Sequence, residues 1–163
     1  MRHASTIILL LAVAAAAPAV GAQPARQVPE PWATVNVCDT TEHPNEMGIR
    51  GSMPGLERPT TMYMRFRVRY RDDEGHWRLV RQGADSGWRR VAAGRGGEHD
   101  SGWTFEFRPP RAGGAYVLKG LVLFEWRRAG RVVDRDRALT DDGHPGTAGA
   151  DPEDFSAEEC EIA

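Results

Sequence analysis

The hydrophobic and polar residues between positions 61 and 71 alternate strictly along the chain. Apolar or aromatic side chains occupy every second position, at Met62, Met64, Phe66, Val68 and Tyr70. The positions between them hold Tyr63, Arg65, Arg67, Arg69 and Arg71. A repeat of two residues places each set on its own face of an extended chain, whereas a helix would spread the arginines around its circumference. Segment 61–71 is therefore predicted to be an antiparallel strand with one buried and one solvated face.

Further segments show apolar residues at strand spacing and are separated by glycine, proline or acidic turn residues. They are 32–38, 47–53, 76–80, 101–108, 116–128 and 131–139. In the third of these segments we expect Trp77 and Leu79 to point into the core.

The longest of these segments, 116–128, is apolar on both faces. Val117, Leu121 and Leu123 lie opposite the side that is predicted to face the core. A strand of this kind is buried on both sides. We therefore expect it to be central in its sheet, or to be covered by the C-terminal segment.

Short strands at fairly even spacing, without a helical period, predict an all-β fold. The expected architecture is a single antiparallel β-sandwich of the immunoglobulin-like or fibronectin type III-like kind, with a disulfide-tethered C-terminal tail. The 141 residues from Gln23 to Ala163 suit one domain.

The first 22 residues have the features of a secretory signal peptide. Arg2 precedes an apolar run at 7–17, and small residues lead up to Ala22. We expect cleavage after Ala22, secretion, and no attachment to a membrane afterwards; a membrane anchor is the alternative, which the short run disfavours. The expected parts of the chain are a signal peptide at 1–22, a Pro-rich flexible leader at 23–31, and a β-sandwich domain at 32–163 that includes an acidic tail at 141–163.

Two cysteines, Cys38 and Cys160, lie near opposite ends of the expected domain. In an oxidising compartment they are predicted to form one disulfide; two free thiols are the alternative. Closing a loop of more than 120 residues contributes about 4–5 kcal/mol in the chain-entropy model. Antibody domains instead bridge two core strands, so the prediction is of the architecture and not of the antibody-type family.

Five blocks of sequence stand out along the chain. They are Trp32-Ala-Thr-Val-Asn-Val-Cys-Asp39, Gly48-Ile-Arg-Gly-Ser-Met-Pro-Gly55, Met64-Arg-Phe-Arg-Val-Arg-Tyr70, Gly102-Trp-Thr-Phe105 and the ending 157–162. Together they resemble a group of uncharacterised secreted proteins of high-GC bacteria, with immunoglobulin-like or fibronectin type III-like β-sandwich domains. The resemblance covers nearly the whole chain after residue 22. It implies a secreted immunoglobulin-like domain, and it implies no activity and no site residues.

The candidate basic face consists of Arg65, Arg67, Arg69 and Arg71. Positions 65–137 hold 17 basic and 10 acidic residues, whereas eight acidic and no basic residues follow position 140. One interpretation is a site for an anionic cell-wall polymer or an acidic glycan. The other, which we favour, is that the acidic tail folds over this face and neutralises it. Nucleic acid is not an expected partner of an exported, net acidic protein.

Segment 82–102 contains six glycines and few apolar residues, so it is predicted to be the least ordered part of the domain. It is also the candidate binding loop, with Trp88, Arg89 and Arg90 at its centre. The sequence Asp-Ser-Gly-Trp occurs at 85–88 and again at 100–103. Two turns built alike explain the repeat, and an aromatic platform for sugars is the alternative.

No motif in the chain predicts a catalytic residue, a cofactor or a metal site. Calcium bound by the C-terminal carboxylates is an alternative to a solvated acidic tail. The residues concerned are Asp134, Asp136, Asp141, Asp142, Asp151 and Asp154. We expect a non-catalytic secreted domain that binds a cell-wall polymer, a glycan or another secreted protein. A hydrolase with an unrecognised site and a structural or inhibitory module are the alternatives.

Overall fold

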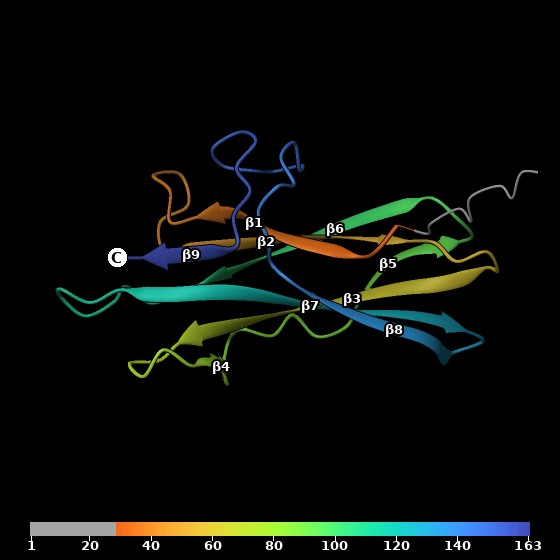
Figure 1. Ribbon diagram of the computed structural model, residues 1–163, viewed down its shortest axis with the longest axis horizontal. Helices are drawn as coiled ribbons and strands as arrows, with labels where there is room; N and C mark the ends of the chain where they lie inside the picture. Colours follow the sequence, from red (N-terminus) through yellow and green to blue (C-terminus); the bar gives the residue numbers. More distant parts are fainter. Residues whose placement is uncertain (1–28) are drawn as a thin grey trace, which may run out of the picture.

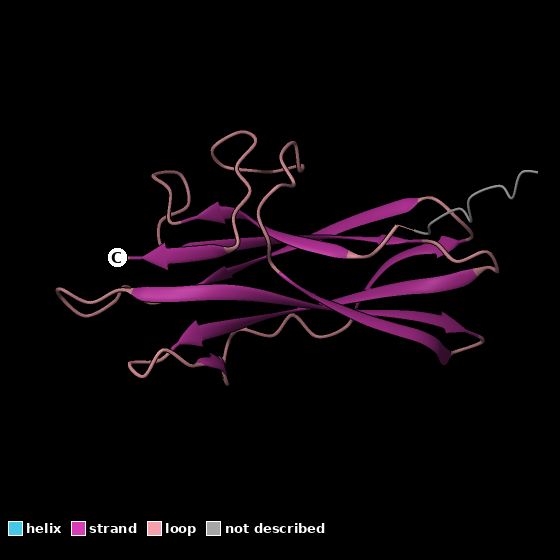
Figure 2. Cartoon of the chain, viewed as in Figure 1, coloured by secondary structure: helices cyan, strands magenta, loops and turns pink. Residues whose placement is uncertain are grey.

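The computed structural model describes residues 29–163, and over this range the chain contains strands and no helix (Figures 1 and 2). The predicted signal peptide and most of the leader lie outside the described residues. No described helix could cross a membrane. The strands are β1 (Trp32–Cys38), β2 (Glu46–Pro54), β3 (Thr60–Arg71), β4 (Trp77–Leu79), β5 (Arg89–Gly94), β6 (Glu98–Glu106), β7 (Tyr116–Arg128), β8 (Arg131–Leu139) and β9 (Glu159–Ile162).

The strands form two antiparallel sheets that face each other, which confirms the predicted sandwich (Figure 1). One sheet has the order β1-β2-β6. The other has the order β4-β3-β7-β8, with β5 paired to β3 and β9 paired to β7. The immunoglobulin-like or fibronectin type III-like type of this sandwich stays a prediction.

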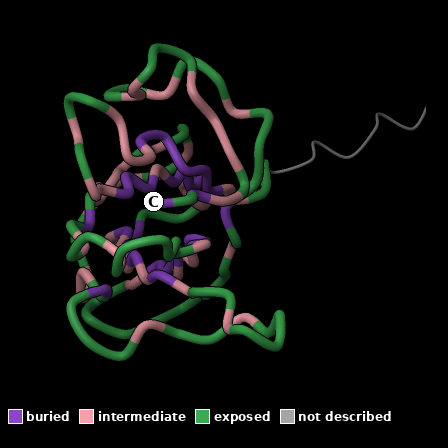
Figure 3. Tube along the Cα trace, turned by 90° about the vertical axis from the view of Figure 1, so that its left-hand side faces the viewer, coloured by how far each residue is buried: buried purple, intermediate pink, exposed green. Residues whose placement is uncertain are grey.

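The core lies between the two sheets and is built largely by the alternating residues of β3. Met62, Met64, Phe66 and Val68 are each 0% exposed, which confirms the predicted faces of this strand. In the end-on view, buried residues gather at the centre and exposed residues follow the loops (Figure 3). The central position of β7 is also confirmed, because β7 pairs with β3, β8 and β9.

The expectation that Trp77 and Leu79 point inward was wrong. Leu79 is paired with Arg69, and Trp77 with Arg71. Directly paired residues of an antiparallel ladder share a face, so both side chains lie on the arginine face of β3. A strand of three residues contains too little alternation to reveal its orientation.

The expectation that 82–102 is the least ordered part of the domain was also wrong. It contains β5 and the first residues of β6. A turn joins these strands at Gly96 and Gly97, whose φ angles of 57° and 78° lie in the left-handed region that favours glycine. Between β4 and β5, residue 85 also forms an isolated bridge to β3. Glycines therefore mark turns between ordered elements here.

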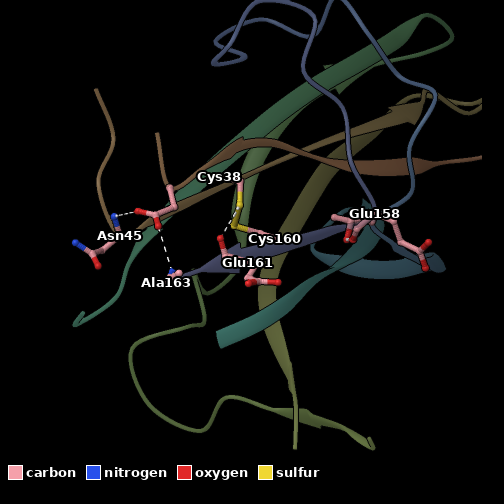
Figure 4. The surroundings of a disulfide bond; sticks show 8 residues. Cys38, Asn45, Glu158, Cys160, Glu161 and Ala163 are labelled. Carbon is pink, nitrogen blue, oxygen red and sulfur yellow. Dashed lines mark hydrogen bonds between the residues drawn. A yellow bond between two sulfur atoms is a disulfide. The ribbon is translucent and has the colours of Figure 1, made fainter. Parts of the chain in front are cut away.

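The predicted disulfide between Cys38 and Cys160 is present (Figure 4). It joins the end of β1, in one sheet, to β9, in the other. The Ala163 amide also donates a hydrogen bond to Asp39 Oδ2 over 3.3 Å. The C-terminal end of the chain is thereby attached to both layers of the sandwich.

Candidate functional site

The arginines of β3 lie on the outer face of the six-stranded sheet, as predicted. Arg65 and Arg67 both contact Asp85, with shortest distances from nitrogen to oxygen of 2.6 and 3.2 Å. The hydrogen bond from Arg65 lowers the pKa of Asp85 below its ordinary value, and burial opposes this shift. Asp85 belongs to the glycine-rich segment. The carboxylate that contacts two of the four β3 arginines therefore comes from that segment.

The interpretation that the acidic tail covers the arginine face was wrong. Its contact with the four arginines is a 3.9 Å ion pair between Arg71 and Glu159. The segment between β8 and β9 instead runs along β1, on the side of the three-stranded sheet (Figure 1). There the Val35 amide donates to Ala157 O over 2.9 Å, and the Thr34 and Ser156 hydroxyls share a 2.8 Å hydrogen bond.

The tail also covers the outer face of β1. Thr34 and Asn36, on the outer side of β1, are 0% and 6% exposed. Asn36 Nδ2 donates to Gly149 O over 3.1 Å. Buried polar groups require hydrogen-bond partners, and the tail provides them. The tail is thus a structural cover for β1, and it leaves the face of the other sheet open.

The candidate binding residues Trp88, Arg89 and Arg90 do not all lie on one face. The guanidinium carbon of Arg89 lies 4.5 Å from the ring centre of Trp103, a residue of β6. Trp88 instead lies near Arg127 on the outer face of the six-stranded sheet, at 5.5 Å. Arg90 is exposed in β5. Arg90 is paired with Tyr63, so it lies on the same outer face as Trp88, whereas Arg89 contacts Trp103.

Around Trp88 the structure forms a cluster of aromatic and charged side chains that sequence reasoning missed. The Arg127 guanidinium stacks 4.1 Å above the ring centre of Tyr63. Glu125, only 4% exposed, pairs with Arg127 over 2.6 Å and with Arg135 over 3.0 Å. A buried carboxylate needs such partners. The cluster thus holds two arginines on one buried carboxylate at one end of the face.

Beside this cluster lie two cavities that meet at Arg137. One, of about 500 Å³, is lined by Trp88, Leu123, Phe124, Glu125, Arg135, Asp136 and Arg137. The other, of about 740 Å³, is lined by Arg69, Trp77, Leu79, Leu121, Arg137 and Leu139. We call the two together the outer groove. Its floor is the part of the outer side of β7 that holds Leu121 and Leu123, which are half-buried.

The outer groove has an apolar centre and a cationic border. Leu79 and Leu139 are 38% and 42% exposed, which is unusual for leucines that lie together. The apolar outer face of β7 could be read from the sequence, but it was interpreted as a buried surface. Leu139 and Arg137 were missed, because the sequence does not reveal the register between β7 and β8. That register places Leu139 beside Leu121 and Arg137 beside Leu123.

The two Asp-Ser-Gly-Trp repeats have different structures, so the interpretation as similar turns was wrong. Asp85 and Ser86 lie in a loop against β3, where Ser86 Oγ accepts a hydrogen bond from the Phe66 amide over 2.9 Å. The second repeat lies within β6. Neighbouring strands, and not the four residues themselves, decide which conformation each copy adopts.

One group of possible cation ligands lies close together in the described chain, and it consists of Asp72, Glu74 and His76 in the turn between β3 and β4. Asp72 already accepts hydrogen bonds from the Glu74 and His76 amides and from Arg78 Nε. The Arg78 hydrogen bond is the main cause of the lowered pKa of Asp72. The group therefore stabilises a hairpin turn.

The acidic residues of the C-terminal quarter do not converge on a common point within residues 29–163. The Arg135 and Arg137 amides donate to Asp134 Oδ1 and Asp136 Oδ1 over 2.8 and 2.7 Å. In the tail, Asp151 accepts a hydrogen bond from the Thr40 hydroxyl. Each of these carboxylates has a separate local role.

No family model matches the chain, and no curated protein matches it. Among solved structures, the sporulation control protein Spo0M from Bacillus subtilis is similar, with 16% sequence identity and a TM-score of 0.29. The match covers 69% of this chain and 49% of Spo0M, so the chain spans about half the length of that structure. A similarity of this size carries no argument about function.

Proposed function

We propose that this protein is a secreted, non-catalytic domain of immunoglobulin-like type that binds a partner outside the cell or in the cell envelope. The binding surface is the outer groove. The observation that carries the proposal is a set of half-buried and exposed leucines, lying together between arginines on an otherwise polar sheet face. Contiguous exposed apolar surface on a soluble protein marks an interaction site.

The disulfide supports the same proposal. A disulfide between β1 and β9 suits an oxidising compartment. A signal peptide cleaved after Ala22 would deliver the chain there. The expected partners in that compartment are a cell-wall polymer, a glycan or another secreted protein.

Neither carboxyl group with a shifted pKa suits the role of general acid in the hydrolase alternative. Hydrogen bonds from arginines lower the pKa of both Asp72 and Asp85. A general acid in a hydrolase requires the opposite shift. These two carboxylates stay ionised and act as partners of Arg78 and Arg65.

The proposal is tested by co-sedimentation of the purified protein with bacterial cell envelopes. The groove variant is Leu139→Asn, and the matched control is Val133→Asn, which changes an equally exposed residue of the same strand at a position outside the groove. We expect the wild type and the control to sediment with envelopes and the groove variant to stay in solution. Equal sedimentation of the two variants, or no binding by the wild type, would contradict the proposal.

A further inference from the structure

Two arginines of the outer groove have no carboxylate partner within residues 29–163. The other cations of this face that belong to β3, β7 and β8 are paired. The pairs are Arg65 and Arg67 with Asp85, Arg71 with Glu159, Lys119 with Glu158, and Arg127 and Arg135 with Glu125. The two that remain are Arg69 and Arg137, and both line the larger cavity. Arg69 and Arg137 are thus the outer-face cations of β3, β7 and β8 that contact no carboxylate of the described chain, and both lie in the groove.

Arg69 and Arg137 border the apolar floor from different strands. Arg69 belongs to β3 and Arg137 to β8, and Leu121 of the intervening β7 lies in the same cavity. Arg69 Nη2 donates one hydrogen bond to Trp77 O over 3.0 Å, which fixes the side chain at the border of the groove. A guanidinium has five donors, so each arginine keeps donors for a ligand carboxylate.

The apolar floor decides which kind of anionic ligand suits the groove. A hydrated anionic polymer would pair with the arginines but leave the leucines in contact with water. A protein segment can bury Leu121, Leu139 and Trp77 with its own apolar side chains and place carboxylates beside the arginines. Trp and Arg around an apolar centre are also the residues enriched at energetically important positions of protein interfaces.

The free edge of the six-stranded sheet is a less suitable docking place than its face. Strand β8 pairs with β7 on one side only among the described residues. The Asp134 and Asp136 side chains accept hydrogen bonds from the following backbone amides. Amides occupied in this way do not bind an added strand, and charged side chains protect an edge further. A partner of the β8 region is therefore expected to lie on the face.

We infer that the outer groove binds an extended protein segment in which Asp or Glu residues alternate with apolar or aromatic ones. The apolar residues contact Leu121, Leu139 and Trp77, and the carboxylates pair with Arg69 and Arg137. This inference rests on the proposed function and adds the chemical class of the partner to it.

The test uses a phage-displayed library of random ten-residue peptides, selected on the purified protein with its disulfide formed. Binding of the enriched peptides is then measured by fluorescence anisotropy. We expect enriched sequences to combine acidic and apolar residues. Arg137→Glu should weaken their binding about tenfold or more, because it replaces attraction by repulsion at the centre of the groove. Arg131→Glu, the same charge change at an exposed position of the same strand outside the groove, should weaken it less than about twofold.

A second arm compares an enriched peptide with a poly-glutamate peptide of the same charge and with oligogalacturonate. We expect both comparison ligands to bind at least about tenfold more weakly, because neither buries the leucines. Equal or tighter binding of oligogalacturonate, lost in Arg137→Glu, would overturn the inference in favour of an acidic glycan. Enrichment of peptides without acidic residues, or no enrichment, would also overturn it. None of these results would change the outcome expected of the envelope experiment. Failure of the inference can therefore be distinguished from failure of the proposed function.

Discussion

Arg65 donates two hydrogen bonds to Asp85, from Nε to Oδ1 over 2.7 Å and from Nη2 to Oδ2 over 2.6 Å. The next residue, Ser86, forms backbone and side-chain hydrogen bonds with Phe66 over 3.0 and 2.9 Å. Residues 84–86 thereby attach to the edge of β3 between β4 and β5. The ion pair fixes the segment that leads into Trp88, so it links the basic strand to the outer groove.

Replacing Asp85 with Asn should lower the free energy of unfolding at neutral pH by about 1–2 kcal/mol, because two charge-assisted hydrogen bonds are weakened at a partly exposed site. The pKa of Asp85 is lowered in the folded protein. Its contribution is therefore present above its ordinary pKa of 3.8 and is lost as the pH falls through the lowered value. Urea unfolding at several pH values should show the two proteins converging in acid.

The control for this experiment is Asp100→Asn, which changes the exposed aspartate of the other Asp-Ser-Gly-Trp repeat. Its effect at neutral pH should stay within about 0.5 kcal/mol. A difference between wild type and Asp85→Asn that persists unchanged at low pH would refute the role assigned to the ion pair.

Removing the disulfide by the double substitution Cys38→Ser and Cys160→Ser should destabilise the protein by about 4 kcal/mol, since 122 residues separate the two cysteines. Urea unfolding of the double variant measures this loss. Wild type with a reductant should unfold at the same urea concentration as the double variant. A reduced wild type as stable as the oxidised one would show that β9 is held by its other contacts alone.

The Thr140 hydroxyl joins two backbone groups in the interior. It accepts a hydrogen bond from the Gly120 amide over 2.9 Å and donates one to Glu158 O over 2.6 Å. Thr140→Val keeps the shape but leaves both groups unpaired, so we expect a loss of about 2–4 kcal/mol. Thr140→Ser keeps the hydroxyl and should lose only about 1 kcal/mol for the missing methyl group. Equal losses in thermal unfolding would count against this assignment.

Phe66 is fully buried at the middle of β3. Phe66→Ala should cost about 3–5 kcal/mol through lost burial and a residual cavity, and Phe66→Asp should prevent folding because its charge would be buried. Tyr70→Ala, on the same side of the strand but 38% exposed, should cost less than about 1 kcal/mol. Normal secretion of Phe66→Asp would mean that the faces of the strand are misassigned.

The sequence predicted those features that depend on local periodicity. The alternation in β3 and the apolar run of β7 specify extended chain and, for β3, the side that is buried, because successive side chains of a strand point to opposite faces. The segments 32–38, 116–128 and 131–139 are strands with the predicted bounds. The pairing of Cys38 with Cys160 followed from their being the two cysteines of the chain.

Tertiary structure alone decided what covers each face. The acidic tail was expected on the arginines because opposite charges attract, but it lies on β1, where its backbone forms hydrogen bonds with Ala33, Val35 and Asn36. These bonds satisfy backbone groups at the edge of β1, whereas a solvent-exposed ion pair contributes little. The outer groove depends likewise on register, since Arg137 and Leu139 reach Leu123 and Leu121 only through the pairing of β8 with β7. Periodicity predicts which residues share a face of one strand. Only the packing of other segments against the strand determines which face stays exposed to solvent.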